Sequence, residues 1–561
     1  MRVSFWGNVG PTSVLSSRLA IKTLTTLEQE YPKKVTTLNI LLLSPRYPES
    51  TFWNLDSSAG AFKNAKSTMA PLGLITVASY LPDDFNLRLV DRNVCEESES
   101  DWVWADAVFL SLMLSQTEDY RQCIARARTH GVGIAVGGPY TSAAPLEAAT
   151  EADWVCEGEA EGVMGQLVDD LRADRRGRIY YGGNKTDLKN VMTPRYDLIE
   201  DADQYAIMPV QFSRGCPFAC EFCDIIEIYG RVPRTKSPSQ IMRELDGIKA
   251  TGFRGGVFIV DDNFIGNRKR ASEMLLELAT WNRTNGAPFF YFTEASINLG
   301  DYPKLLLAME RANFIFVFIG IETPDSDLLR AAQKTQNTTG DLMERLATIR
   351  RHGIHVIAGM IVGFDGEDRH VFERQRAFIE ESGIGIVTFG LLQALPNTQL
   401  SRRLQKEGRL LKGLPVSLNH TIEGMNFTPK TELTKREYLE LQMEIIEDLY
   451  EPEAFFRRIV FAHLSIRRTS PHPAKLSNVI SLMRMMYRLG WCVPQVRRPF
   501  WRTFFKVAMK NPSALAGFYY DCFHYFHLLD HRHQVRRGIS DYLAAPSVDD
   551  VIDSCTESPA I

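Results

Sequence analysis

Three cysteines crowd into one short stretch of the chain, "SRGCPFACEFCDIIEIYGR". Cys216, Cys220 and Cys223 follow one another at spacings of four and three residues, and thiolates so placed bind soft metals. A structural zinc site needs four ligands, usually as two separated pairs, and no fourth Cys or His lies near this triplet. Three cysteines on one loop can instead hold three irons of a [4Fe–4S] cluster and leave the fourth iron open to a small molecule. A zinc site completed from elsewhere and three cysteines without any metal are the competing interpretations.

The cysteines directly follow the first of several predicted strands that alternate with helices. The predicted strands cover 207–213, 256–261, 288–295, 315–321, 356–363 and 385–391. The helices between them are expected near 237–251, 268–284, 303–312, 338–353 and 368–382. This pattern predicts an open or partial (β/α)6 TIM-like barrel over 206–430, with its active site at the carboxyl ends of the strands. The cysteine stretch begins at that rim.

A second α/β region precedes the barrel, at 37–175. It opens with the apolar run "LNILLLSPRYP" and continues with alternating strands and helical stretches, which predicts a parallel doubly wound sheet. Ligands bind such sheets beyond the carboxyl ends of the strands. Ser111, Leu112 and Met113 end one predicted strand, and Gly137 with Gly138 ends another, so both groups are expected at that edge.

Changes in composition set the remaining boundaries. Residues 1–36 are expected to be an N-terminal extension, and 176–205, rich in Gly, Asn, Asp and basic residues, a linker. Strand signals disappear from about 431, where helical periodicity predicts a C-terminal helical domain reaching 543. An acidic tail at 544–561 follows.

Composition and charge narrow the class of protein. A hydrophobic share of 45% and a charged share of 24% are ordinary for a globular chain, and no apolar run reaches the ~18 residues that span a bilayer. The net charge of -4 and the absence of a recognition motif predict no nucleic-acid partner. The other cysteines are scattered, which fits a reducing cytoplasm rather than a disulfide framework.

The region 451–540 differs from the rest in charge. It holds 15 basic and four acidic side chains, a net charge of +11, interleaved with aromatic residues as in "RRPFWRTFFK" and "GFYYDCFHYFHLL". This pattern favours peripheral contact with an anionic membrane surface, where a lipid-like substrate would be reached. A basic, well-packed helical cap with its aromatic residues in the core is the competing interpretation.

The CxxxCxxC stretch resembles the signature of the radical S-adenosylmethionine (SAM) superfamily, in which the three cysteines bind a [4Fe–4S] cluster and SAM takes the open iron. Phe222, before the third cysteine, fits the same pattern. The resemblance implies homolytic cleavage of SAM to a 5′-deoxyadenosyl radical, with electrons from a flavodoxin- or ferredoxin-type donor. Later segments also resemble this superfamily, and they imply SAM contacts from Asp261, Asp262, Asn263, Glu294, Ser296 and Glu322.

The region 37–175 resembles the cobalamin-binding domain that precedes the barrel in one radical SAM branch. Ser111-Leu112-Met113, Gly137-Gly138 and "EGEAE" at 157–161 carry this resemblance, which implies that Ser111, Leu112, Gly137 and Gly138 contact cobalamin. Many cobalamin proteins have Asp-x-His-x-x-Gly after the first strand, whereas the loop here, "SPRYPESTFW", has no His. A domain that has lost cobalamin and only covers the barrel is the alternative.

Together the motifs resemble the subgroup that contains hopanoid C-2 methyltransferases. The resemblance implies a cobalamin-dependent C-methyltransferase that acts on an unactivated carbon of a hydrophobic, hopanoid-like substrate and uses two SAM molecules per turnover. A radical SAM enzyme of tetrapyrrole or pigment synthesis, by ring methylation or cyclisation, is the alternative. A non-catalytic iron–sulfur or cobalamin sensor is a third, and the motifs beyond the cysteines argue against it.

Overall fold

The computed structural model describes residues 37–48, 51–183, 186–411, 425–466 and 476–544. The expected N-terminal extension and nearly all of the expected acidic tail lie outside the described residues.

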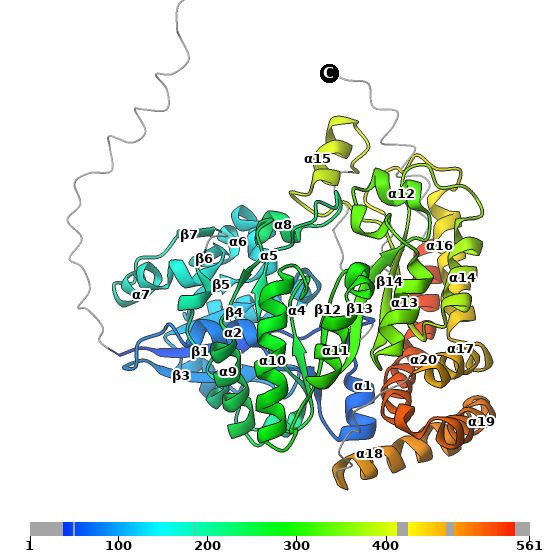
Figure 1. The fold of residues 1–561 in the computed structure, drawn as a ribbon. Coiled ribbons are helices and arrows are strands. Elements are labelled where there is room, and N and C mark those ends of the chain that lie inside the picture. The colour runs from blue at the N-terminus through cyan, green and yellow to red at the C-terminus, as the bar shows by residue number, and fades with distance from the viewer. Residues whose placement is uncertain (1–36, 49–50, 184–185, 412–424, 467–475, 545–561) are drawn as a thin grey trace, which may run out of the picture.

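The N-terminal region forms a six-stranded parallel sheet (Figure 1). In spatial order its strands are β3 (Asn86–Asp91), β1 (Asn39–Ser44), β4 (Ala107–Ser111), β5 (Gly133–Gly137), β6 (Trp154–Gly158) and β7 (Arg178–Gly183). Every neighbouring pair is parallel. This confirms the predicted doubly wound sheet, and the reversal of strand order puts its switch point between β1 and β4.

Alternate residues of these strands enter two separate cores, one on each face of the sheet. Leu41 and Val108 belong to one core, which contains residues of α3 (Glu99–Trp104) and α4 (Thr117–Thr129). Leu42 and Phe109 belong to the other, which contains residues of α2 (Leu72–Ala78) and α7 (Met164–Arg172). Burial on both faces explains why the strands read as continuous apolar runs.

The segment expected to be a linker is partly structured. It contributes β7, the edge strand of this sheet, paired in parallel with β6. The strand alternates between exposed and more buried residues, so its composition resembles that of a surface loop. Short 3-10 turns carry the chain from β7 to the barrel.

The second sheet is an open curl of seven parallel strands. Their spatial order is β15 (Ile386–Leu391), β14 (His355–Val362), β13 (Phe314–Glu322), β12 (Phe290–Glu294), β11 (Gly256–Ile259), β8 (Tyr205–Val210) and β2 (Ser67–Met69). Six of these strands were predicted. The seventh, β2, comes from the N-terminal half of the chain and pairs with β8. Three residues are too short a run to carry a periodic signal, so the sequence did not predict it.

Helices cover the outer face of this barrel (Figure 1). They are α9 (Pro238–Ala250), α10 (Arg268–Thr284), α11 (Pro303–Arg311), α13 (Leu342–Arg351) and α14 (Val371–Ser382). Ser237 and Gln240 form a reciprocal cap at the start of α9, which fixes where the chain turns from the cysteine loop into the helix.

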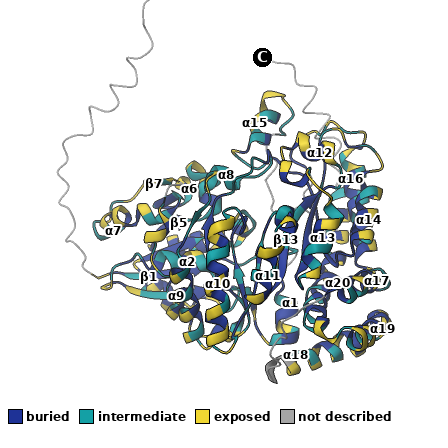
Figure 2. Ribbon diagram, viewed as in Figure 1, coloured by how far each residue is buried: buried dark blue, intermediate teal, exposed yellow. Residues whose placement is uncertain are grey.

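The C-terminal region is helical, as predicted. It comprises α16 (Lys435–Leu449), α17 (Pro452–Ser465), α18 (Leu476–Tyr487), the π-helix η9 (Arg488–Cys492), α19 (Pro494–Lys510) and α20 (Leu515–Ala544). These helices pack along one side and one end of the barrel (Figures 1 and 2). In the part of the chain that the structure describes, every helix is too short or too polar to cross a membrane.

Candidate functional site

The loop with the three cysteines is closed at its base by a small hairpin. After β8, the two-residue strand β9 (Ser213–Arg214) pairs antiparallel with β10 (Arg234–Thr235). Gly215 has φ +93°, and a Cβ on it would lie 2.8 Å from the carbonyl oxygen of Gly230. Only glycine therefore suits this point, where the loop turns away from the barrel toward the cysteines.

Side-chain amides from two other segments, the loop after β11 and a 3-10 turn after β13, lie close to two of the thiols. Asn263 points its Nδ2 at Cys216 Sγ, 3.7 Å away, and Gln336 points its Nε2 at Cys220 Sγ, 3.5 Å away. The Lys334 ammonium lies 5.7 Å from the centre of the Phe222 ring. Burial raises the pKa of the Cys216 and Cys223 thiols, so their thiolates need a positive partner to form. Nearby N–H donors and an ammonium fit an anionic iron–sulfur cluster.

The three sulfurs are too far apart for one small ion. Zinc with Zn–S bonds of about 2.3 Å would bring tetrahedral thiolates roughly 3.8 Å apart. Among the described residues, the group of three Cys, His or carboxylate donors that lie mutually within 4.8 Å is a different one, without cysteine. The donor set therefore fits a group larger than a single zinc ion.

Asp261 and Asp262 follow β11 but differ in their contacts. The fully buried Asp261 carboxylate accepts hydrogen bonds from the Phe212 N–H at 2.7 Å and the Ser213 hydroxyl at 2.6 Å. It therefore anchors the start of the cysteine loop. Oδ2 of Asp262 is enclosed and has no hydrogen-bond partner among the described residues. Burial, reinforced by Asp261, raises the pKa of Asp262 to about 7.

Glu294, the last residue of β12, is a second carboxylate at the same rim. Burial raises its pKa to about 8, and the charges of Asp262 and Asp261 add to the shift. Two buried acids without a cation among their described neighbours form a site that favours a positively charged ligand. The SAM amine and sulfonium supply such charge, so these residues fit SAM.

Asn263 and Ser296, both expected to contact SAM, lie next to each other. Asn263 Oδ1 accepts from the Ser296 N–H at 3.3 Å and from its hydroxyl at 3.4 Å. Because the other end of the Asn263 amide faces Cys216, this residue connects the cluster loop to the end of β12.

Glu322 lies at the same rim, but its carboxylate already has a cationic partner within the chain. It ends β13 in the left-handed region, with φ 65°, beside an irregularity in the pairing with β14. Its carboxylate forms an ion pair with Lys334, near Cys220. Asn337 also donates to the carbonyl oxygens of Gly320 and Ile321, each at 3.0 Å. Lys334, Gln336 and Asn337 were not predicted, because they lie in or beside a 3-10 turn that has no motif.

The four residues expected at the cobalamin site lie at the carboxyl ends of β4 and β5. Leu112 donates its N–H to the Gly137 carbonyl at 3.3 Å, and its carbonyl accepts from Tyr140. Gly138 has φ +103°, and a Cβ on it would lie 2.9 Å from the Leu112 oxygen. The half-buried Ser111 lies beside the switch point between β4 and β1. This tight, small-residue rim fits a nucleotide-like group approaching the backbone.

The loop after β1 reaches the barrel. Trp53 packs edge-on against Phe318 of β13, with ring centroids 5.1 Å apart. Nε2 of His527, in α20, lies 3.0 Å from the carbonyl oxygen of Thr51. The loop itself supplies no imidazole, so a histidine near it would have to come from the C-terminal helices.

The segment "EGEAE" at 157–161 connects the N-terminal sheet to the barrel through ion pairs. The buried Glu159 carboxylate accepts from Arg214 at 3.1 Å and from Arg234 at 2.9 Å, and Glu161 accepts from Arg214 at 2.5 Å. Both arginines belong to the hairpin beneath the cysteine loop. The sequence did not predict these pairs, since arginines beside the cysteines carry no spacing signal for partners some 50 residues earlier in the chain.

Half-buried aromatic side chains line the face of the barrel sheet that its helices leave open. Phe258 and Phe292 stack with ring centroids 4.6 Å apart, and Phe318 is covered by Trp53. Their strand neighbours, such as Val257 and Ile259, are fully buried in the main core. Since side chains alternate along a strand, the aromatic residues point to the opposite, inner face.

Comparison with known families agrees with this arrangement. A B12 binding domain matches residues 60–168, the radical SAM superfamily matches 210–379, and a domain of unknown function (DUF4070) matches 398–541. A solved structure of OxsB, a cobalamin-dependent SAM radical enzyme with aqua-cobalamin and SAM bound, covers 92% of this chain and 82% of its own, with TM-score 0.58 and 16% identity. At that identity the likeness shows the fold alone.

Relatives of higher identity identify the family. An uncharacterized methyltransferase of Synechocystis, sll1242, is 38% identical over 93% of this chain and 98% of the relative. The hopanoid C-2 methylase of Rhodopseudomonas palustris is 35% identical over 85% of this chain and 90% of the relative. The bacteriochlorophyllide d C-12(1)-methyltransferase of Chlorobaculum tepidum is 22% identical over 69% of this chain and 84% of the relative.

The fold and family matches define a radical SAM enzyme that carries a B12-binding domain. Within that class the chain belongs to the family of cobalamin-dependent radical SAM methyltransferases that includes the hopanoid C-2 methylase. The radical SAM and B12-binding matches give the chain a [4Fe–4S] cluster, SAM and cobalamin as its cofactors.

Proposed function

We propose that this protein methylates an unactivated carbon of a hydrophobic, hopanoid-like substrate and uses two SAM molecules per turnover. The aromatic inner face of the barrel, formed by Phe258, Phe292, Phe318 and Trp53, is the observation that carries the proposal. These rings offer apolar area rather than hydrogen bonds, so they favour a substrate with little polar surface. The 35% identity to the hopanoid C-2 methylase supports the lipid class.

Cys216, Cys220 and Cys223 hold the cluster in this proposal. When bound, the cofactors supply the electron, the hydrogen-abstracting radical and the transferred methyl group. Asp261 keeps the cysteine loop in place through Phe212 and Ser213. The Lys334 ammonium, held by Glu322, balances negative charge near Cys220. A flavodoxin- or ferredoxin-type protein delivers the electrons.

Asp262 and Glu294 bind the positive groups of SAM. Burial and the neighbouring acids raise the pKa values of both carboxyl groups. A bound cation would stabilise the ionised carboxylates. Asn263 and Ser296 orient this edge of the site, because their mutual hydrogen bonds tie it to Cys216.

Ser111, Leu112, Gly137 and Gly138, at the carboxyl rim of the N-terminal sheet, would hold cobalamin, which would supply the transferred methyl group. Trp53, from the loop after β1, contacts Phe318 of the barrel at the edge of this region. The loop after β1 contains no His, so cob(II)alamin in the protein should give an electron paramagnetic resonance spectrum without nitrogen splitting. Splitting that disappears in a His527→Gln variant would contradict this, because α20 would then supply the ligand.

The test is an anaerobic reaction with a pentacyclic triterpenoid lipid, SAM, cobalamin and a reductant. We expect 5′-deoxyadenosine and a lipid heavier by one CH₂ group, both detected by mass spectrometry, and neither with the Cys216→Ala/Cys220→Ala/Cys223→Ala variant. Lipid profiles of a deletion strain should lack the methylated lipid. An unchanged lipid in both experiments would overturn the proposal.

Pigment synthesis is the second candidate. The bacteriochlorophyllide methyltransferase is a more distant relative, and an aromatic inner face would also stack on a planar tetrapyrrole. Methylation of a chlorin substrate, with no product from the lipid, would favour this candidate.

Peripheral contact with a membrane accompanies the lipid proposal. Exposed apolar side chains gather on the outer helices α18, η9 and α19: Val479, Ile480, Met483, Tyr487, Trp491, Phe505 and Met509. The exposed basic residues Arg497, Arg498, Lys506 and Lys510 lie beside them. Other aromatic residues of this region, such as Phe500 and Tyr525, are buried, as the helical-cap interpretation predicted. These helices lie at the end of the barrel away from the cysteine loop, so the contact anchors the protein without opening the active site onto the bilayer (Figure 1).

A further inference from the structure

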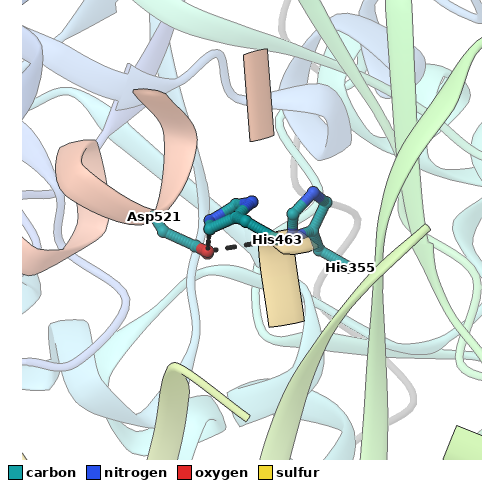
Figure 3. Close-up of side chains that lie close together, drawn as sticks. All are labelled: His355, His463 and Asp521. Atoms are coloured by element: carbon teal, nitrogen blue, oxygen red, sulfur yellow. Dashed lines mark ion pairs between the residues drawn. The ribbon is translucent and has the colours of Figure 1, made fainter. Parts of the chain in front are cut away.

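A buried group of two histidines and one aspartate joins the barrel to the C-terminal helices. His355 is the first residue of β14, His463 comes from α17, and Asp521 comes from α20 (Figure 3). All three are buried, His463 completely. One donor atom from each lies within 4.8 Å of the other two, which makes this the one such group among the described residues.

The distances within the group suit ligands of a single ion. Asp521 Oδ2 lies 2.9 Å from His463 Nε2 and 3.7 Å from His355 Nδ1 (Figure 3). Tetrahedral zinc with bonds of about 2.0–2.1 Å to nitrogen and oxygen sets its ligand atoms roughly 3.3–3.4 Å apart. The observed separations lie on either side of that value.

The orientation of His463 distinguishes this group from a simple ion pair. Although Nε2 is 2.9 Å from the carboxylate, its N–H direction is not aligned for a hydrogen bond, and neither ring nitrogen of His463 has a hydrogen-bond partner among the described residues. A protonated imidazole would leave two buried N–H groups without acceptors, which is unfavourable. Close approach without a hydrogen bond is compatible with two ligand atoms that share a cation.

Packing fixes the other histidine. The Nε2 side of His355 lies against the backbone of α20 at Gly517, where any Cβ would overlap the ring. Nδ1 is thereby left as the nitrogen that faces Asp521. This close packing fixes the orientation of the His355 ring.

We propose that His355, His463 and Asp521 bind one Zn²⁺ ion that fastens α17 and α20 to the amino end of β14. Two imidazoles and one carboxylate are ordinary zinc ligands, and a water completes the tetrahedron. The ion is separate from the iron site, because β14 runs eight residues, roughly 23 Å, from His355 to the carboxyl rim. Its role is structural, and it does not depend on which substrate is methylated.

The test is elemental analysis of the full chain, purified without a histidine tag from zinc-supplemented medium. Iron and cobalt also occur in the cofactors, so zinc is the informative element. We expect about one zinc per chain in the wild type and in the Cys216→Ala/Cys220→Ala/Cys223→Ala variant, which excludes zinc trapped by the cysteine loop. His463→Gln and Asp521→Asn should each remove at least four-fifths of it.

The matched control is His524→Gln. His524 also lies on α20, close to Asp521, but its Nδ1 faces the Tyr520 carbonyl at 2.9 Å and it is not one of the three donors. This variant should retain its zinc. Equal zinc loss in the control would overturn the assignment of the ligands.

Two measurements on the wild type need no substitution. X-ray absorption at the zinc edge should show only nitrogen and oxygen neighbours at about 2.0–2.1 Å. Chelator-treated protein should regain several degrees in its thermal midpoint when zinc is restored. Protein that contains no zinc and is not stabilised by it would overturn the proposal, whatever its activity.

Discussion

The two ends of the barrel strands hold buried carboxylates in opposite situations. At the carboxyl ends, Asp262 and Glu294 face no cation from the described chain, and burial raises their pKa values to about 7 and about 8. At the amino ends, burial would raise the pKa of Asp521, but contact with His463 and the charge of His355 lower it below its usual value. The same chemical group thus faces no cation at one end and lies beside two histidines at the other.

This difference indicates that the carboxyl ends of the strands serve function and the amino ends serve stability. A buried acid without a partner destabilises the folded chain, so it is retained where a ligand supplies the missing charge. The amino end is covered by α17 and α20, and its acid has two histidine neighbours within the chain. In β/α barrels generally, the carboxyl face carries chemistry and the opposite face carries stability.

The largest expected effect is at the carboxyl end. Replacement of Cys216, Cys220 and Cys223 by Ala should abolish cluster iron, its charge-transfer absorption and all methyl transfer, because each thiolate binds one iron. Iron and sulfide analysis with absorption spectroscopy measures this directly. Retention of four irons per chain would contradict it.

Cysteines elsewhere provide the control for that experiment. Burial raises the pKa of Cys123 and of Cys156 to about 12, so both thiols stay protonated and are poor ligands. Cys95→Ser, at an exposed position, should leave iron content and stability unchanged. Cys123→Ser and Cys156→Ser should also keep the cluster.

The second prediction concerns the two acids without partners. Asp262→Asn and Glu294→Gln should each weaken SAM binding roughly 10- to 100-fold, since a charged hydrogen bond contributes about 1.5–3 kcal/mol. Iron content should not change. Glu273→Gln, an exposed ion-paired position on α10, is the control and should bind SAM normally. Normal affinity in both site variants would remove these residues from the SAM site.

The same acids predict a pH dependence with a definite sign. Below their raised pKa values both carboxyls are protonated and neutral, so they attract a cation less. SAM affinity should therefore rise as the pH increases from 6 to 9, by up to about tenfold per group for each unit below its pKa. Calorimetry in buffers of different ionisation enthalpy should detect proton release on binding. Affinity that falls over this range would contradict the assignment.

At the amino end, a substitution should affect stability and not chemistry. Gly517→Ala would push a methyl group into His355 and should lower the free energy of unfolding by about 1–3 kcal/mol, the usual cost of overpacking. Gly165→Ala on α7, where a Cβ would meet nothing within 4 Å, is the matched control and should stabilise by up to about 1 kcal/mol. Iron content and SAM affinity should stay normal in both. Loss of the cluster in Gly517→Ala would show that the two ends are coupled.

Local patterns were sufficient to predict the barrel, the N-terminal sheet and the helical C-terminal domain. The barrel strands are long apolar runs, and the cysteine spacing is a compact motif, so both appear in a short window of sequence. β2 and β7 were missed because one has three residues and the other is a half-exposed edge strand.

The parts of the site that depend on distant pairing could not be predicted. Asp261 was expected to contact SAM, but its two hydrogen bonds to Phe212 and Ser213 suit an anchor for the loop. Glu159 pairs with Arg214 and Arg234 across more than 50 residues of sequence, and Lys334 reaches Cys220 from a 3-10 turn. Tertiary packing determines which distant residues pair, and a single sequence contains no local signal for such pairs.

The smallest expected effect is at the outer helices beyond the amino end. Arg498, Arg502, Phe505 and Met509 recur at helical spacing on α19, so they share one exposed stripe. Each basic residue near an anionic surface contributes about 1 kcal/mol at most, and the Debye length falls from about 10 Å at 0.1 M salt to about 3 Å at 1 M. Binding to anionic vesicles should therefore be reversible and salt-sensitive, and weak on neutral vesicles.

Two sets of substitutions on α19 distinguish the contribution of charge to membrane binding from the contribution of apolar contact. In vesicle sedimentation, Arg497→Glu/Arg498→Glu/Arg502→Glu should release the protein at low salt, while Phe505→Ser/Met509→Ser should weaken binding at every salt concentration, because apolar insertion is not screened. Leu276→Ser, an equally exposed apolar position on α10 at the outer wall of the barrel, should have no effect. Equal sedimentation of the wild type and both stripe variants would mean that α18 and α19 only cap the helical domain. The amino end of the barrel would then carry stability alone, and the proposed lipid substrate would reach the enzyme from solution or from a carrier.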